Sequence, residues 1–381
     1  MTDLNDANKK KLGLQYLRAI AAILVVAYHA DGIFHRGGRP FFFNLHEGRA
    51  GVDLFFVLSG YVIMHAHSRH IGVSATIGSY LWKRIWRVFP LATLATAFTF
   101  GLVLISGEAA HKLKPWSIAA SFMMIAQDGF PVLNVTWTLA FEIFFYAVFA
   151  SWIVSVPLGC TVVALWACLA ACFYSGAIEL TGTLAIYCQP IILEFALGIL
   201  VYLTLTRSGG LFGKSALVAG ATLFIISIIV RTTWDLYPHQ PRGSEWEKYE
   251  LSNVWIDLLT YGAPSALLIY GTVACDKSRY KQKLLGALGD ASFAIYLFHR
   301  PVMLITDRLI APKIGNDTVT AFFGMSIAVF IGYLLHCLVD EHIQNWGRST
   351  KQPPITPGEI RAASDRSAAS SDRISRSDRR S

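Results

Sequence analysis

The sequence predicts an all-α, polytopic integral membrane protein with about ten transmembrane helices and both ends in the cytoplasm. Hydrophobic residues make up 54% of its 381 residues and charged residues 15%, whereas soluble domains carry about 25% charged residues. The mean hydropathy is +0.46, and the apolar residues fall in repeated runs that are long enough for membrane-spanning helices. Together these observations argue against a soluble fold.

Apolar runs divide the chain into spans and short connecting segments. Spans are predicted at residues 14–31, 51–67, 88–106, 137–155, 158–176, 184–206, 214–231, 252–274, 288–310 and 318–340. A piece at 116–126 is too short to cross and is expected to be interfacial or re-entrant. We therefore expect a cytoplasmic segment at 1–11, a transmembrane domain at 12–345 and a disordered cytoplasmic tail at 346–381.

The distribution of positive charge predicts the orientation. With the N-terminus inside, the inner segments contain three lysines at 9–11, the W-K-R-I-W-R run at 82–87 and the K-S-R-Y-K-Q-K run at 277–283. Inner segments of membrane proteins usually carry the excess of Lys and Arg. The outer segment 31–50 is an exception because it holds arginines, whereas acids outnumber bases in the outer segment 232–251. The balance favours both ends inside, hence a multi-pass protein of the inner membrane. The net charge of +8 does not indicate nucleic-acid binding.

Two ionisable side chains interrupt the first predicted span. Arg18 and His29 are 11 residues apart, about three helical turns, so they share one face of the helix. At about 1.5 Å per residue their separation along the axis is roughly 16 Å. Each alone has a simpler explanation, Arg18 as an interfacial anchor and His29 as a helix-end residue bonded to a carbonyl. Their shared face favours a polar site inside the bundle.

Three further residues are candidate site residues that could assist His29. Asp53 lies in the run G-V-D-L-F-F-V-L-S-G and enters the membrane where the first span ends, so its carboxylate is a candidate to orient the imidazole. It is also an ordinary helix N-terminal acid. Glu142 lies inside an aromatic helix and shares a face with Tyr146. Within that first run, Gly60 is expected to allow close helix packing rather than chemistry.

The remaining candidates lie in two other runs. Arg84 and Arg87 are three residues apart, hence neighbours if the segment is helical, and two guanidinium groups suit the phosphates of a cytoplasmic ligand. An ordinary positive-inside loop is the alternative explanation. His299 precedes a helix-kinking Pro301 near the middle of the ninth span, as a site residue or as a structural histidine. No metal-ligand spacing is evident, and no metal is expected.

Five motifs in this order resemble acyltransferase family 3, the membrane-bound O-acyltransferases that include exopolysaccharide acetyltransferases. The resemblance covers nearly all of residues 12–345. The motifs are L-x-x-L-R-A-I-A-A with R-x10-H, G-V-D-L-F-F-V-L-S-G-Y-x-I, K-R-x-x-R-V-F-P, W-T-L-A-F-E-x-x-F-Y and S-F-A-I-Y-L-F-H-R-P. The family pattern usually has Ser and Tyr where Thr138 and Phe89 stand, which are mild changes.

The resemblance implies an enzyme that moves an acyl group from cytoplasmic acyl-CoA to a hydroxyl of a glycan or glycolipid. Acetyl-CoA is the expected donor. It implies His29 as the central catalytic residue, with Arg18, Arg84 and Arg87 near the donor. Acceptor recognition is expected in the outer loops. A proton-coupled carrier that uses the same buried ionisable residues is the alternative, although the two similar halves typical of many carriers are not evident.

Overall fold

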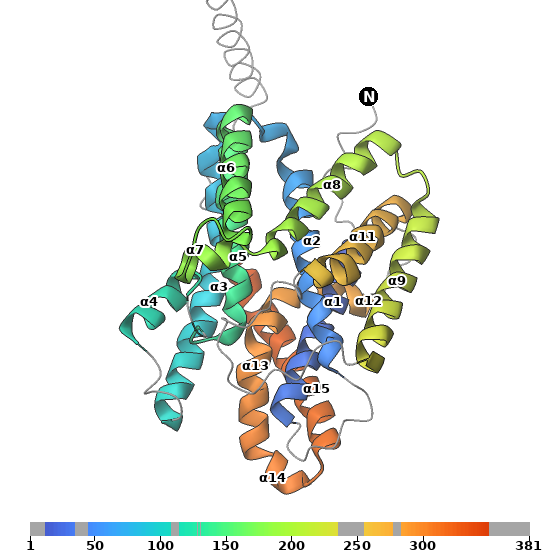
Figure 1. Cartoon of the computed structure of the whole chain (residues 1–381). Helices are drawn as coiled ribbons and strands as arrows, with labels where there is room; N and C mark the ends of the chain where they lie inside the picture. Colours follow the sequence, from blue (N-terminus) through green and yellow to red (C-terminus); the bar gives the residue numbers. More distant parts are fainter. Residues whose placement is uncertain are drawn as a thin grey trace, which may run out of the picture.

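The structure, a computed structural model, describes residues 12–34, 45–107, 114–127, 129, 131–234, 255–276 and 283–349. These residues form α-helices joined by short turns and contain no strand (Figure 1). The helices are α1 (Leu12–Phe34), α2 (Ala50–His67), α3 (Ile77–Ser106), α4 (Pro115–Met123), α5 (Trp137–Val154), α6 (Val156–Tyr174), α7 (Gly182–Tyr187), α8 (Leu193–Ser208), α9 (Gly213–Trp234), α11 (Ala263–Cys275), α12 (Lys283–Asp290), α13 (Ser292–Leu309), α14 (Ala311–Ile314), α15 (Asp317–Leu335) and α16 (Glu341–Ser349).

Within the described ranges, nine helical segments are long and apolar enough to cross a membrane, which confirms the predicted all-α polytopic class. The predicted span at 288–310 corresponds to α12 and α13 and is not among the nine. Three charged residues, Arg300, Asp307 and Arg308, interrupt the apolar character of α13. This helix still lies along α15 in the bundle (Figure 1).

Three boundaries differ from the predicted ones. Helix α3 begins at Ile77, so much of the segment predicted as an inner loop before residue 88 is helical. The predicted span 184–206 is divided into α7 and α8, and Pro190, which begins the short 3-10 turn between them, explains the break. The short apolar piece at 116–126 forms α4, which ends at Met123; the next residue, Met124, has a left-handed φ of 53°.

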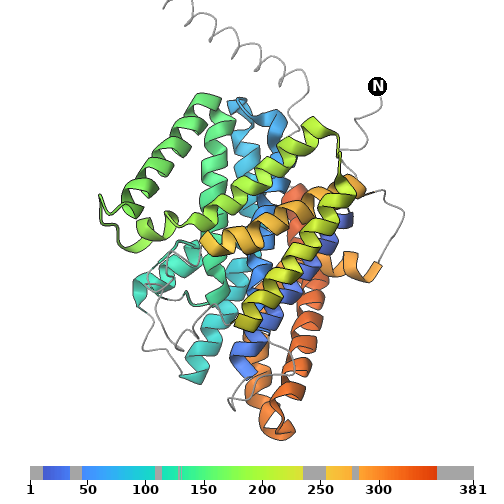
Figure 2. The ribbon, with the colours of Figure 1, turned by 45° about the vertical axis from the view of Figure 1, so that its right-hand side comes forward.

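Helix α1 is central to the half of the bundle that holds the polar site. It contacts α2, α12, α13 and α15, and its buried Ala19, Ala21 and Ala22 leave room for these neighbours (Figure 1). Helix α2 packs closely on α8, because a Cβ atom on Gly60 would lie 2.1 Å from the Phe195 carbonyl oxygen. This contact confirms the predicted packing role of Gly60. Helices α9 and α11 form a second close pair (Figure 2).

The C-terminal helices return to α3. A five-residue π-helical turn, His336–Asp340, links α15 to α16, and α16 lies against α3. There the Trp86 Nε1 atom donates to the Ile343 carbonyl oxygen over 2.8 Å. The predicted segment 1–11, residues 350–381 of the predicted tail and most of the predicted outer loops lie outside the described residues. The predicted orientation, with both ends inside, stays a prediction.

Candidate active site

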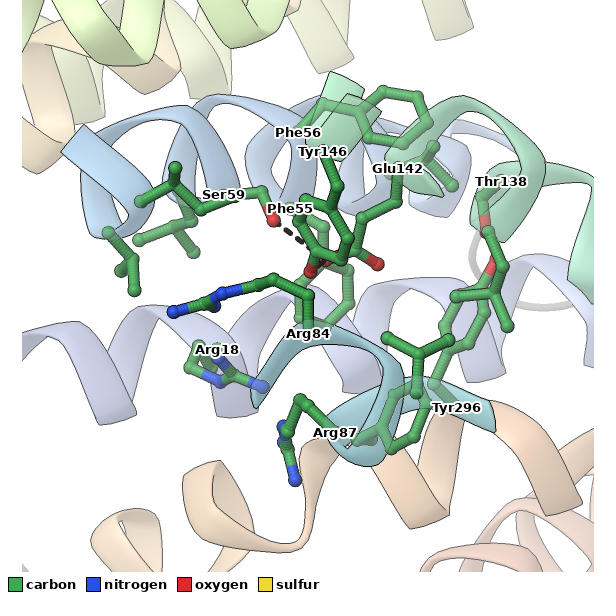
Figure 3. Close-up of a pocket in the computed structure, with 17 residues that line it drawn as sticks. Arg18, Phe55, Phe56, Ser59, Arg84, Arg87, Thr138, Glu142, Tyr146 and Tyr296 are labelled. Carbon is green, nitrogen blue, oxygen red and sulfur yellow. Dashed lines mark hydrogen bonds between the residues drawn. The ribbon is translucent and has the colours of Figure 1, made fainter. Parts of the chain in front are cut away.

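A polar pocket of about 820 Å³, including its open mouth, lies between α1, α2, α3, α5 and α13 (Figure 3). Apolar side chains form most of its wall, and its charged side chains are three arginines and one glutamate. The lining residues are Arg18, Val52, Phe55, Phe56, Leu58, Ser59, Val62, Ile63, Arg84, Arg87, Val88, Thr138, Leu139, Glu142, Tyr146, Phe293 and Tyr296. Sequence positions from 18 to 296 thus converge on one pocket.

The polar face of α1 lies against α13. The Arg18 Nε atom donates to the Ser292 Oγ atom over 3.2 Å, at the start of α13. Further along, the ring of His29 lies 5.0 Å from the ring of His299, measured between centroids. Both side chains therefore contact the same neighbouring helix, as their shared face predicts.

Helix α3 supplies the two other arginines of the pocket. Because this segment is helical, Arg84 and Arg87 are neighbours on one face, and Figure 3 shows them beside Arg18. Arg84 donates to the His67 Nε2 atom over 2.8 Å. The Arg87 Nη1 atom lies 3.6 Å from a carboxylate oxygen of Asp340, whose side chain is fully buried. The three cations thus lie at one end of a largely apolar cavity.

Glu142 is the pocket's acid, and two hydroxyl groups hold it. The Ser59 Oγ atom donates to Glu142 Oε1 over 2.9 Å, and the Tyr146 hydroxyl donates to the same oxygen (Figure 3). Tyr146 lies one turn along α5, so the predicted shared face of these two residues is present. Glu142 also interacts electrostatically with Arg18. It therefore serves as a counter-charge within the arginine cluster.

The two imidazoles lie beside the pocket rather than in its lining. His299 is fully buried; its Nδ1 atom lies 3.1 Å from the Ile295 carbonyl oxygen, and its Nε2 atom has no hydrogen-bond partner among the described residues. Tyr296 lines the pocket, and its ring lies 6.0 Å from that of His299. The Tyr296 side chain therefore neighbours both the arginine pocket and His299.

The structure gives Asp53 a different partner from the predicted one. Asp53 is buried on α2 and does not line the pocket. Its carboxyl group interacts with that of Glu194 on α8, and Asp257 and Arg49 are its other charged neighbours. None of these contacts is with His29, so the predicted orientation of the imidazole by Asp53 has no geometric support here.

Several neighbours of the site are not apparent from the sequence. His67 and Asp340 contact the pocket arginines from outside the lining, and Ser59 holds Glu142 although its sequence context indicates only packing. Tyr296 is part of the motif S-F-A-I-Y-L-F-H-R-P, yet its place in the pocket lining depends on the tertiary fold. Over the described ranges, no group of three His, Cys, Asp or Glu side chains is arranged to hold a metal ion.

Comparisons with known proteins identify relatives of this chain. The profile of an acyltransferase domain family matches residues 11–337. Exopolysaccharide production protein ExoZ of Rhizobium meliloti (strain 1021) is 26% identical over 328 residues, which cover 80% of this chain and 92% of ExoZ. Acyltransferase MdmB of Streptomyces mycarofaciens is 26% identical over 378 residues, 85% of this chain and 89% of MdmB. A third relative, from Bacillus subtilis (strain 168), is provisionally named peptidoglycan O-acetyltransferase YrhL; it is 26% identical over 370 residues, 85% of this chain and 52% of YrhL. No solved structure matches significantly.

Proposed function

Because this chain belongs to acyltransferase family 3 and is a multi-pass membrane acyltransferase, we propose that it O-acylates a glycan. The donor is a cytoplasmic acyl-CoA, with acetyl as the acyl group. The acceptor is a hydroxyl of an exopolysaccharide, a surface glycan or a lipid-linked sugar, reached from the inner membrane. The names of ExoZ and YrhL support a polysaccharide acceptor and an acetyl group, respectively.

The single observation that carries the donor proposal is the convergence of Arg18, Arg84 and Arg87 on one pocket. Forked guanidinium groups bind phosphate oxygens through paired charge-assisted hydrogen bonds. Glu142 and, more weakly, Asp290 interact with Arg18, and Asp340 pairs with Arg87. Arg84 instead has a histidine, His67, as its hydrogen-bond partner. The phosphates of an anion such as CoA would supply a counter-charge there, and the apolar wall suits its uncharged arm.

The pair His29–His299 is the proposed reaction centre. His29, as a neutral imidazole, removes the proton from the acceptor hydroxyl while that oxygen attacks the thioester carbonyl. The new bond is the ester C–O bond, the bond that breaks is the C–S bond, and the thiolate leaves with the proton that the imidazole took up. In the alternative route, His29 itself is first acylated on nitrogen. We propose direct transfer. His299, rather than Asp53 or Glu142, is the residue that we propose to orient His29.

The role that we propose for Glu142 lies in the donor pocket rather than in the reaction centre. Its carboxylate lies among the arginines, and the hydroxyls of Ser59 and Tyr146 fix its position. We assign it the task of holding Arg18 in the pocket rather than contacting the acceptor. A carrier function would use the same buried charges, but family membership favours acyl transfer over transport.

The test is acyl transfer in inverted membrane vesicles supplied with labelled acetyl-CoA. Wild type is compared with Arg84→Ala, His29→Ala and the control His342→Ala, which changes an exposed histidine of α16 outside the pocket lining. Label in a glycan or glycolipid with wild type and His342→Ala, but not with His29→Ala, is the expected result. Acyl-histidine trapped after acetyl-CoA alone would overturn direct transfer. Label that depends on neither His29 nor Arg84 would overturn the proposed site.

A further inference from the structure

His67 lies immediately behind the arginine pocket. It is the last residue of α2, it is 3% exposed, and it does not line the pocket itself. Its ring meets the ring of Tyr80 edge-on, with 4.9 Å between centroids. A buried imidazole in contact with a proposed donor-binding arginine requires an explanation, and its hydrogen bonds supply one.

These hydrogen bonds fix the protonation of His67. An arginine nitrogen only donates, so the 2.8 Å contact from Arg84 Nη2 requires a lone pair on His67 Nε2. The His67 Nδ1 atom then carries the ring's proton and donates it to the His70 Nδ1 atom, 3.0 Å away. His67 is therefore a neutral acceptor, and His70 in turn fixes its tautomer.

A neutral acceptor holds Arg84 without cancelling its charge. The guanidinium of Arg84 also lies over the rings of Tyr80 and Tyr146, at 5.9 and 5.7 Å from their centroids. Arg87 differs, because the carboxylate of Asp340 is its partner and offsets part of its charge. Arg84 is thus oriented by side chains that leave its positive charge for an anionic ligand.

We propose that His67 is a positioning residue that aims Arg84 at the phosphates of the acyl-CoA donor. The proposal rests on the donor site described above and adds the residue that organises it. Loss of the acceptor frees a long side chain, whose reordering on binding then opposes donor affinity. Loss of one hydrogen bond to a charged group corresponds to a rise in the donor KM of about tenfold or more. Because His67 is not part of the reaction centre, kcat is expected to stay unchanged.

The experiment compares His67→Leu with His67→Gln in the full-length protein in nanodiscs. Glutamine keeps an oxygen that accepts from Arg84, whereas leucine does not. Titration calorimetry with CoA measures donor binding, and transfer assays give KM and kcat separately. The matched control is His65→Leu, two residues earlier on α2, where the imidazole packs on Tyr61 and Tyr202 instead. His67→Leu is expected to weaken CoA binding and raise KM, while His67→Gln and His65→Leu stay near wild type.

Two outcomes separate this proposal from the donor site itself. If Arg84→Ala leaves CoA binding unchanged, the proposed donor site is overturned. If Arg84→Ala weakens binding but His67→Leu does not, only the positioning role is overturned. Equal loss in His67→Leu and His67→Gln would also overturn it, because both variants remove the ring and only one removes the acceptor. In an Arg84→Ala background, His67→Leu is expected to have no further effect.

Discussion

The imidazole rings of His29 on α1 and His299 on α13 lie 5.0 Å apart, measured between their centroids, inside the helix bundle. A carbonyl oxygen only accepts, so the contact with Ile295 places the proton of His299 on Nδ1 and a lone pair on Nε2. That buried lone pair has no partner among the described side chains. It can accept from His29 or from the acceptor hydroxyl, so we expect the two rings to work as a pair.

Replacing His29 with alanine is expected to lower kcat by about 10²–10⁴-fold, because the general base is lost. The donor KM is expected to change little, since the arginine pocket does not include His29. Steady-state transfer of labelled acetyl groups from acetyl-CoA measures both constants. A His29→Ala enzyme with wild-type kcat would remove this imidazole from the chemistry.

His299→Leu is expected to lower kcat by less than His29→Ala, because it removes an orienting acceptor rather than the base. His299→Gln keeps an oxygen that accepts a hydrogen bond and is expected to recover part of the rate. The same assay, with the amount of folded protein matched by size-exclusion chromatography, measures the difference. If the leucine and glutamine variants are both as active as wild type, His299 does not take part in catalysis with His29.

Glu142→Gln separates charge from hydrogen bonding in the pocket. The amide oxygen can still accept from Ser59 and Tyr146, so the unfolding temperature is expected to stay near that of wild type. The counter-charge of Arg18 is lost, and we expect transfer to fall about tenfold, with the reduction mainly in kcat/KM for acyl-CoA. Glu142→Ala, which also removes the acceptor, should lose stability as well. Full activity in Glu142→Gln would show that the negative charge is not needed.

Helix periodicity and residue chemistry were enough to predict much of the fold and of the pocket. The shared face of Arg18 and His29 follows from helix geometry alone, and their common contact with α13 agrees with it. Arg84 and Arg87 also meet in the pocket, because the segment that carries them is helical. These predictions depend on spacing within a single helix, which is fixed locally.

Contacts between helices were not predictable in the same way. The partner of Asp53 depends on how α2 rotates against α8, and the close contact at Gly60 turns its carboxyl group toward Glu194 rather than toward His29. Likewise, Asp340 reaches Arg87 only because α16 returns to α3. The registers of such packing are properties of the whole bundle, and no spacing along one sequence determines them.

The last prediction concerns stability away from the pocket. Asp257 accepts two hydrogen bonds from Arg49, at 3.1 and 3.2 Å, and one from Arg231 at 2.6 Å. Arg231 is 2% exposed, so Asp257→Asn would remove the nearer carboxylate of a buried cation and leave it with Glu47 at 3.9 Å. Breaking a buried ion pair in this way costs about 3–5 kcal/mol.

We therefore expect Asp257→Asn to lower the unfolding temperature clearly in detergent micelles, while the protein that remains folded still binds CoA. Glu341→Gln is the matched control, because it removes a carboxylate whose side chain is 56% exposed and pairs with His336 at 3.5 Å. A pair whose acid is solvent-exposed contributes about 0–1 kcal/mol, so the control should unfold near the wild-type temperature. Equal unfolding temperatures for Asp257→Asn and Glu341→Gln would mean that the cluster around Asp257 does not stabilise the bundle. A loss of CoA affinity without a change in unfolding temperature would instead connect this cluster to the donor site. That result would contradict the prediction, because Asp257, Arg49 and Arg231 do not line the pocket.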